Sequence, residues 1–303
     1  MTILVGCSGW SYDDWVVRFY PKELAKKKDE WLSYYAQFFN TVEINSTYYH
    51  PPGKRQVQSW IKKVKDREDG FEYSVKMPGL VTHQALVEGD EEKALFWTGT
   101  FDKTCLSPLA EANLLGAVLF QLSPHFKNEG QALSRLAMVL DYLATKEYDL
   151  AVEFRHRSWL DESGDDLDPA TLEVLKDRNA ANVMIDGPGH YPGNTLTADQ
   201  AYVRFHGRNY DIWYGREKEV DHRLDRYDYL YDTEQLERWV PRIREAELKT
   251  TKVRMFFNNH ARAKAVRNAF QMMDMLLIDH KSKEIHLQDQ FTLGEFRGNP
   301  KNE

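Results

Sequence analysis

Cysteine is scarce in this 303-residue chain, which contains Cys7 and Cys105 and no others. Two cysteines exclude a scaffold held by several disulfide bonds and a zinc site built from four cysteines. One lies in an expected strand and the other in a distant helical segment, so we expect both thiols to be reduced and unreactive. Long apolar runs are also lacking. None approaches the roughly 18 residues that a membrane-spanning helix needs, and we expect no membrane partner.

The chain also lacks an excess of basic residues. The chain has 40 Lys and Arg against 47 Asp and Glu, which gives a net charge of −7. A net acidic chain is a poor general binder of duplex DNA, although a local basic patch can still bind nucleic acid. The segment from Met1 to Ser8 enters a strand-like run directly, without the basic leader of a signal peptide. These features predict a cytoplasmic globular protein.

What is present is a repeated rhythm of short β-rich runs, with amphipathic stretches between most of them. The eight runs are Ile3–Ser8, Thr41–Asn45, Phe71–Lys76, Gly116–Gln121, Leu150–Arg155, Asn182–Asp186, Tyr202–His206 and Val253–Asn258. Eight strands that alternate with helices over about 250 residues predict an α/β fold, a single TIM-type (β/α)8 barrel. We expect the barrel to occupy residues 1–280 and a C-terminal tail to follow at residues 281–303.

Helical patterns fill most of the intervals between these runs. They cover Trp31–Phe39, Lys54–Lys65, Leu133–Leu143, a stretch that opens at Asp168-Pro169, Thr233–Glu247 and Ala261–Leu277. Two segments break the rhythm. Asp186–Gln200 is too rich in glycine and proline for a helix, so we expect no regular sixth helix. Gly207–Asp232 is long, aromatic and charged, and predicts an insertion after the seventh strand that covers the barrel mouth as a lid.

Within the runs, apolar and polar side chains alternate, as they do on the two faces of a strand. In the second run Val42 and Ile44 oppose Glu43, and the other runs follow the same pattern. In the sixth run we place Val183 and Ile185 on the apolar face and Asp186 on the polar face. The apolar sets suit the surrounding helices, so we expect the polar sets to point into the barrel.

Seven motifs in order resemble the domain-of-unknown-function 72 family, also called YecE-like. They are GCSGWSYDDW with FYP, NTVEINSTYY, FEYSVKMPGLVTH, LGAVLFQLSPHF, AVEFRHRSWL, YVRFHGR and MFFNNHARAKAVRNA, and they run from about Gly6 to Leu277. The resemblance implies a TIM-type barrel and supplies no established reaction. One departure is Ser123-Pro124, where the family usually has paired prolines; this alters the stiffness of a loop and bears on no chemistry.

Each predicted strand ends in a polar side chain, and barrel active sites lie at these strand ends. The resulting ring contains Ser8, Asn45, Lys76, Gln121, Arg155, Asp186, His206 and Asn258, above a deeper layer of Glu43, Glu153 and Arg204, with Glu72 and Arg254 further from the strand ends. A salt-bridge network that only fills the barrel explains the deeper layer as well as a functional role does. The ring itself predicts a ligand site.

The cationic members of the ring predict an anionic ligand, with phosphate or carboxylate as its charged group. Lys76, Arg155 and nearby Arg208 are expected to orient the anion. Asp186 or Glu153 would act as general base, and His206 as general acid or base. The remaining candidate contacts to the ligand are Ser8, Glu43, Asn45, Gln121, Arg204 and Asn258.

The sequence requires no cofactor and predicts no metal site. Glu43, Glu153, Asp186 and His206 are residue types that could hold a single divalent ion, but they lack a close spacing such as His-Glu-x-x-His. The last strand ends in Asn258-Asn259, whose amides are weak ligands for zinc. A cluster of several metal ions is therefore not expected.

Aromatic residues follow several strands on the side of the mouth. They are Trp10, Tyr12, Trp15, Tyr48, Tyr49, Trp159, Trp213 and Tyr214. Rings beside cations suit a sugar or a nucleobase, including single-stranded nucleic acid, and packing of the loops explains them equally well. Three functions therefore remain open: an enzyme of hydrolase or phosphodiesterase type, a nucleic-acid-binding or repair-associated module, and a non-catalytic ligand-binding barrel.

Overall fold

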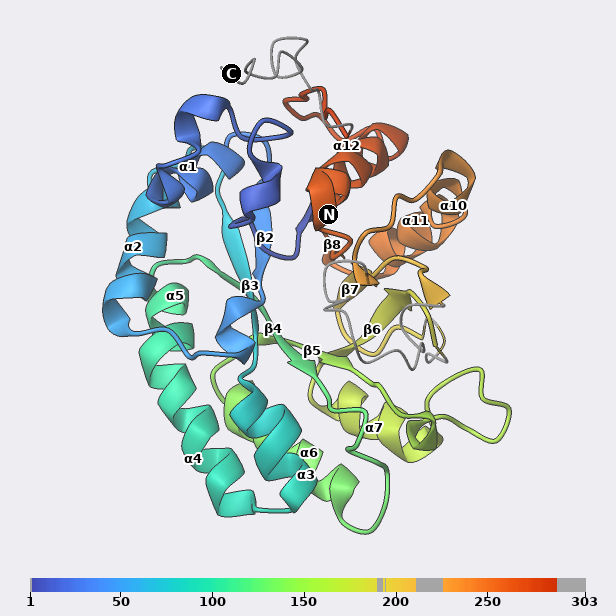
Figure 1. Ribbon diagram of the computed structural model, residues 1–303. Coiled ribbons are helices and arrows are strands. Elements are labelled where there is room, and N and C mark those ends of the chain that lie inside the picture. The colour runs from blue at the N-terminus through green and yellow to red at the C-terminus, as the bar shows by residue number, and fades with distance from the viewer. Residues whose placement is uncertain (1, 190–192, 194, 211–225, 288–303) are drawn as a thin grey trace, which may run out of the picture.

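Eight parallel strands form the centre of the computed structural model, which describes residues 2–189, 193, 195–210 and 226–287 (Figure 1). The strands are β1 (Thr2–Cys7), β2 (Thr41–Ile44), β3 (Glu72–Lys76), β4 (Leu115–Gln121), β5 (Asp149–Glu153), β6 (Ala180–Asp186), β7 (Gln200–Phe205) and β8 (Lys252–Phe257). Their order in the sheet is β1-β8-β7-β6-β5-β4-β3-β2. This is a nearly closed, TIM-barrel-like arrangement, as predicted, and the strands lie close to the predicted positions.

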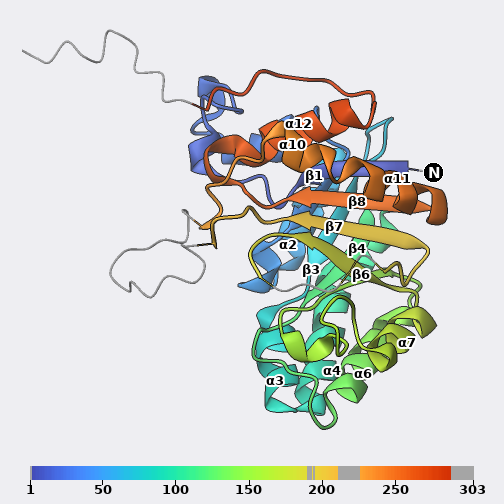
Figure 2. The ribbon, with the colours of Figure 1, turned by 90° about the vertical axis from the view of Figure 1, so that its right-hand side faces the viewer.

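Helices surround this sheet, and Figure 2 shows α10, α11 and α12 over the side formed by β1, β7 and β8. The helices are α1 (Trp31–Tyr35), α2 (Lys54–Val64), α3 (Leu86–Glu88), α4 (Glu91–Phe101), α5 (Ser107–Glu111), α6 (Ala132–Ala144), α7 (Pro169–Asp177), α10 (Thr233–Glu237), α11 (Val240–Lys249) and α12 (Lys264–Met275). The predicted helix over Thr233–Glu247 is divided into α10 and α11. The helix predicted over Trp31–Phe39 ends at Tyr35.

Local sequence explains where α7 begins. Asp168 precedes the helix with extended backbone, and its carboxylate accepts a hydrogen bond from the Thr171 N–H at 3.1 Å. Pro169 occupies the first turn, where the missing N–H costs no hydrogen bond within the helix. The Asp-Pro pair is therefore a helix start, as the sequence predicts.

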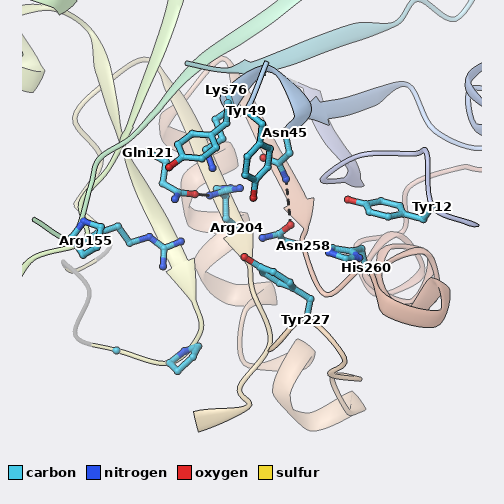
Figure 3. Close-up of a pocket in the computed structure, with 14 residues that line it drawn as sticks. Tyr12, Asn45, Tyr49, Lys76, Gln121, Arg155, Arg204, Tyr227, Asn258 and His260 are labelled. Carbon is cyan, nitrogen blue, oxygen red and sulfur yellow. Dashed lines mark hydrogen bonds between the residues drawn. The ribbon is translucent and has the colours of Figure 1, made fainter. Parts of the chain in front are cut away.

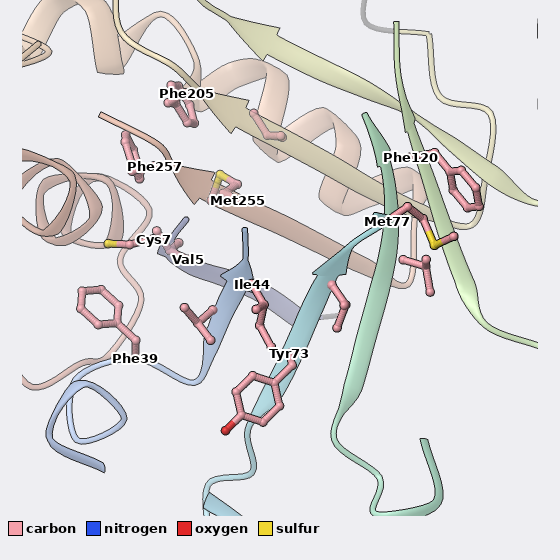
Figure 4. Packing of buried hydrophobic residues seen from close by; sticks show 14 of the residues in the cluster. Val5, Cys7, Phe39, Ile44, Tyr73, Met77, Phe120, Phe205, Met255 and Phe257 are labelled. Carbon is pink, nitrogen blue, oxygen red and sulfur yellow. The ribbon is translucent and has the colours of Figure 1, made fainter. Parts of the chain in front are cut away.

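The outward faces of the strands pack against the helices in one large apolar cluster (Figure 4). Val42, Val203 and Met255 belong to it, as expected from strand alternation. Both thiols, Cys7 and Cys105, are also buried there and form no disulfide. Burial raises the pKa of each thiol, which fits the expectation that they are unreactive.

The alternation predicted for β6 is reversed in the structure. Val183 belongs to a small apolar cluster that includes Ala117, Ala151 and Phe256, with Ile185 packed against it, and this cluster is separate from the outer core. Strand alternation then directs Asp186 outward. Apolar side chains of β6 therefore complete this inner cluster.

Two charged layers lie above and below this apolar cluster. At the amino-terminal ends of the strands, Arg254 contacts Glu72 at 2.5 Å and Asp149 at 2.8 Å. Near the carboxyl ends, Arg204 contacts Glu43 at 2.7 Å and Glu153 at 2.5 Å. The single deeper layer expected from the sequence is therefore two separate ion-pair clusters at opposite ends of the barrel.

A narrow seam separates β1 from β2, because no ladder of backbone hydrogen bonds joins them in the described sheet. The Tyr35 hydroxyl crosses this seam: it accepts a hydrogen bond from the Cys7 N–H at 2.8 Å and donates one to the Thr41 carbonyl at 3.0 Å. A Cβ atom at Gly6 would lie 2.4 Å from the Thr41 carbonyl oxygen, so glycine is required for this approach. The Tyr35 side chain therefore joins β1 to β2, where the backbone hydrogen bonds of a ladder are missing.

The segments that break the predicted rhythm are only partly described. The described residues between β6 and β7 contain no helix, and residues 190–192 and 194 lie outside the description. Residues 211–225 of the predicted Gly207–Asp232 insertion, with Trp213 and Tyr214, also lie outside it, as do residues 288–303 of the predicted tail. In the described part of the predicted tail, residues 281–287, Lys283 donates hydrogen bonds to the Phe19 carbonyl at 2.6 Å and the Tyr34 hydroxyl at 2.9 Å. No helix within the described ranges is long and apolar enough to cross a membrane.

We expect Tyr35→Phe to lower the free energy of unfolding by about 2 kcal/mol. The substitution leaves the Cys7 N–H and the Thr41 carbonyl buried without a partner, and such groups cost about 1–3 kcal/mol. Urea denaturation measures the change. Tyr49→Phe, at a side chain that is 73% exposed, is the matched control and should change stability by less than about 0.5 kcal/mol. Equal stabilities of the two variants would show that the seam does not depend on the Tyr35 hydroxyl.

Candidate functional site

A cavity of about 460 Å³ opens at the carboxyl ends of the strands (Figure 3). Its walls come from residues of β3, β4 and β7 and from the segments after β1, β2, β4, β5, β6, β7 and β8. The lining residues are Tyr12, Asn45, Tyr48, Tyr49, Lys76, Gln121, Pro124, Arg155, Pro188, Gly189, Arg204, Tyr227, Asn258 and His260. A volume of this size suits a small molecule.

Six of the twelve residues predicted for the site line this cavity. They are Asn45, Lys76, Gln121, Arg155, Arg204 and Asn258. The structure brings together side chains from β3, β4 and β7 and from the segments after β2, β5 and β8. The convergence expected from strand ends is therefore present for these six.

Arg204 and Arg155 are the two guanidinium groups among the described lining residues. Arg204 is fully buried, and besides its two carboxylate partners it donates to the Gln121 Oε1 atom at 2.8 Å. Arg155 bonds to the Glu153 carboxylate and contacts the His206 Nε2 atom at 2.9 Å. These contacts fix both planar groups at the floor and wall of the cavity.

Glu43 and Glu153 lie beneath the lining rather than in it. Both are fully buried. Burial alone would raise the pKa of Glu153, but Arg155 and Arg204 outweigh burial and hold this pKa well below its usual range. The Tyr202 hydroxyl donates a hydrogen bond to Glu43 at 2.7 Å. Both carboxylates serve the arginines as counter-ions, and this geometry does not present either one to a ligand as a general base.

His206 also supports the lining from behind. Its ring lies between Arg155 and Asn258, with the Asn258 Nδ2 atom 3.0 Å from His206 Nδ1. Burial, followed by the charge of Arg155, lowers the pKa of His206 to about 4. The imidazole is therefore neutral at pH 7, and it holds Arg155 and Asn258 in place.

Lys76 differs from the two arginines in its surroundings. It is the last residue of β3 and is 9% exposed. Its Nζ atom lies 4.3 Å from the centre of the Tyr48 ring. Burial, with the charge of Arg204 as the next contribution, lowers the pKa of Lys76 to about 7.

The structure places Asp186 and Arg208 away from the cavity. The Asp186 carboxylate accepts hydrogen bonds from Arg208 at 2.7 and 2.5 Å and from the Trp239 indole at 2.7 Å. Because β6 has the opposite alternation to the one predicted, this acid faces the α10–α11 side of the barrel. Asp186 is buried and Arg208 is partly exposed, and their pair ties the segment after β7 to the outer apolar cluster.

Ser8 is the remaining predicted contact, and it too is covered. It is fully buried and forms a β-bridge with Glu43 across the seam. Within the described chain its hydroxyl has no hydrogen-bond partner. Ser8 therefore lies under the cavity wall and not on it.

Sequence reasoning missed His260 and Tyr227 as lining residues. The His260 ring stacks on Tyr12 at a centroid distance of 4.3 Å and lies 5.0 Å from the Tyr227 ring. The spacing of His260, two residues after the Asn258 strand end, could have indicated it. Tyr12, Tyr48 and Tyr49 line the cavity on the predicted side. By contrast, Trp15 and Trp159 are fully buried in the core and serve packing.

No group of three or more His, Cys, Asp or Glu side chains that could hold a metal ion is found among the described residues. Glu43, Glu153 and His206 do lie near one another, yet Arg155 and Arg204 occupy the space around the two carboxylates. This geometry gives a divalent ion no support.

Comparison with known proteins gives a consistent family. The family model described as "Protein of unknown function DUF72" matches residues 4–290. UPF0759 protein YunF from Bacillus subtilis (strain 168) is 28% identical over 286 residues, which cover 92% of this chain and 96% of YunF. UPF0759 protein YecE from Escherichia coli (strain K12) is 30% identical over 154 residues, which cover 51% of this chain and 48% of YecE.

Solved structures agree with these relatives. A DUF72 family protein from Thermotoga maritima MSB8 is 33% identical with a TM-score of 0.75, covering 91% of this chain and 100% of that one. A DUF72 family protein from Enterococcus faecalis V583 is 24% identical with a TM-score of 0.75, covering 94% and 100%. The second likeness concerns the fold alone.

We expect the protein to become less stable when the pH is lowered from 7 to 5. The titration of His206 alone should lower the free energy of unfolding by about 2 kcal/mol. The pKa of this imidazole is about 4 in the folded protein and about 6.5 in an unfolded chain. Between these values the unfolded chain binds a proton that the folded chain does not, so stability is lost as the pH falls from about 6.5 towards 4. Chemical denaturation at both pH values measures the loss.

His206→Gln should reduce this pH dependence, whereas His50→Gln at an exposed position should retain it. Some dependence will remain in the first variant, because burial also lowers the pKa values of His83 and His260 to about 4. Identical pH dependence in the two variants would contradict the burial of a neutral imidazole at His206.

Proposed function

The chain belongs to the DUF72 family, which is described as having unknown function, and from this premise we propose that the cavity binds a small ligand with an anionic group, a phosphate or a carboxylate. One observation carries the proposal: Lys76, Arg155 and Arg204 all line the cavity, whereas Glu43 and Glu153 lie beneath it. A ligand in the cavity therefore meets cationic groups first. Charge-assisted hydrogen bonds to such groups are the usual means of holding phosphate and carboxylate.

Unused hydrogen-bonding capacity supports the same proposal. The Lys76 ammonium can donate three hydrogen bonds, and it lies against a ring face. A ligand oxygen in the cavity would accept such a hydrogen bond, and leaving the Lys76 donor without an acceptor costs free energy.

A hydrolase or phosphodiesterase activity, which the sequence favours, is less well supported by this geometry. Such a reaction needs a general base or a metal-bound water beside the ligand. Among the described lining residues there is no carboxylate, and Glu153 and His206 are held beneath the lining by Arg155. The proposal therefore commits to recognition of the anion, and hydrolysis is not part of it.

A second candidate ligand is single-stranded nucleic acid, and one feature favours it. The Tyr49 ring lines the cavity and is 73% exposed, close to the cationic groups. Bases stack on such rings while cations hold the phosphates. In this reading Tyr49→Ala weakens binding of an oligonucleotide and leaves binding of inorganic phosphate unchanged.

We expect Arg155→Ala to weaken binding of inorganic phosphate by about 10–100-fold, because a partly desolvated charge-assisted hydrogen bond contributes roughly 1.5–3 kcal/mol. Lys62→Ala, at an exposed position on α2, is the control and should change the affinity by less than about twofold. Isothermal titration of both variants with phosphate, a small carboxylate and a short oligonucleotide measures the effects. Equal affinity in two folded variants would mean that the cationic groups are structural.

A further inference from the structure

Lys76 combines burial with a lack of counter-charge. Its side chain is drawn into the cavity in Figure 3, beside Tyr49 and Gln121. In the described part of the chain no carboxylate lies within ion-pair distance of its Nζ atom, while Glu43 and Glu153 are already bonded to arginines. A lysine that served only to fill the barrel would be paired, because an unpaired buried ammonium is costly.

Burial favours the neutral form of Lys76, and the charged groups around it act in both directions, the arginines lowering its pKa and the two glutamates raising it. The charged and titratable groups that face it are Arg204 on β7, Arg155 after β5, Glu153 on β5, Glu43 on β2, His83 in the helical segment η5 (Leu80–Ala85), and Tyr48 after β2. With burial as the main cause, they leave Lys76 with a pKa of about 7. About half of the amine is then neutral at pH 7, against roughly one part in 2,500 for an ordinary lysine. A neutral amine has a lone pair that can attack carbon.

Other nucleophiles near the cavity are less suitable. Cys7 points into the outer core, and burial raises its pKa. The Ser8 hydroxyl is fully buried under the wall. His260 lines the cavity, but its ring is enclosed between Tyr12 and Tyr227. Lys76 is thus the amine that the described cavity presents to a ligand.

The position of Lys76 is also fixed from the backbone. The Thr47 hydroxyl lies 2.6 Å from the Lys76 carbonyl oxygen and 3.0 Å from that of Ile44, so it ties the end of β3 to the end of β2. The side chain then extends along the Tyr48 ring, whose centre is 4.3 Å from Nζ. A rigid strand end and a ring face are the kind of support that holds a reacting group in one place.

We propose that Lys76 forms a Schiff base with a small carbonyl compound whose carboxylate or phosphate group is held by Arg155 and Arg204. This inference rests on the proposed function, because the anionic group is what the two arginines recognise. It goes further by assigning a covalent step and a substrate class, an oxo compound with an acidic group.

The step balances without an oxidant or a metal. The Nζ lone pair forms a bond to the carbonyl carbon, the carbonyl oxygen takes up a proton, and a carbinolamine results. The nitrogen then loses a proton and the hydroxyl leaves as water, which gives the imine. A protonated imine withdraws electrons from the neighbouring carbon, so the bonds of that carbon become easier to break.

Reductive trapping tests the inference with pyruvate as the probe. The full-length protein is incubated with pyruvate and cyanoborohydride at pH 7, and the modified lysines are identified by peptide mass spectrometry. We expect Lys76 to be labelled at least a hundredfold faster than exposed Lys62, with a rate that rises between pH 6 and 8 as the amine loses its proton. In Lys76→Arg, which keeps the charge and lacks the amine, this fast labelling should disappear.

Parallel labelling with acetone separates the two proposals. Acetone has the carbonyl group without the anion, so pyruvate should label Lys76 at lower concentrations, and inorganic phosphate should compete with pyruvate. Fast labelling of Lys76 by both compounds without competition would support the reactive amine and contradict anion recognition. Tight binding of pyruvate or phosphate, with Lys76 labelled no faster than Lys62 in folded protein, would overturn the Schiff base and leave the proposed function standing.

Discussion

The ion pairs of Arg204 hold together the half of the barrel that lies at the carboxyl ends of its strands. Its guanidinium is fully buried and joins Glu43 on β2 and Glu153 on β5 to β7. A buried pair of this kind adds little net stability, but the loss of one partner typically costs 3–5 kcal/mol because a charge is left uncompensated. Glu153 also holds Arg155, and Arg155 contacts His206. The positions of Arg155 and, through His206, of Asn258 therefore depend on one chain of contacts that begins at Arg204.

That chain of contacts gives the cavity its sign of charge. The carboxylates pair with the arginines below the lining, and both arginines line the cavity, Arg155 with part of its side chain exposed and Arg204 fully buried. Lys76 stands outside these pairs, against the Tyr48 ring. Arg155 and Arg204 thus form structural ion pairs below the lining and are also the residues proposed to recognise the ligand. The charges inside the barrel are nearly balanced, yet the side chains that face its mouth are cationic. The pairing below the lining explains this, although the chain as a whole is acidic.

The sequence is sufficient for the barrel and for half of the site, and two physical effects limit it elsewhere. Alternation works where polar and apolar residues differ clearly, as in β2, β7 and β8. It fails in β6, because both faces of Asn182–Asp186 carry apolar residues and the outward Asp186 is compensated by Arg208 and Trp239, which no local pattern indicates. Depth is the second limit. Strand position does not separate a residue that touches the cavity, such as Arg155, from one directly behind it, such as His206, because side-chain length and packing decide between them.

The seam between β1 and β2 has a consequence for how the chain assembles during synthesis. β1 leaves the ribosome first, yet its ladder partner is β8, with Thr2 opposite Lys252 and Cys7 opposite Phe257. Its sequence neighbour β2 is linked to it by the Tyr35 hydroxyl of α1 and by the bridge between Ser8 and Glu43. The first strand must therefore stay without a ladder until β8, about 250 residues later, has emerged. Pairing at such a sequence separation is slow, and an unpaired strand edge invites aggregation in the meantime. Thr2 and the glycine at position 6 limit the apolar stretch of that waiting strand to Ile3, Leu4 and Val5.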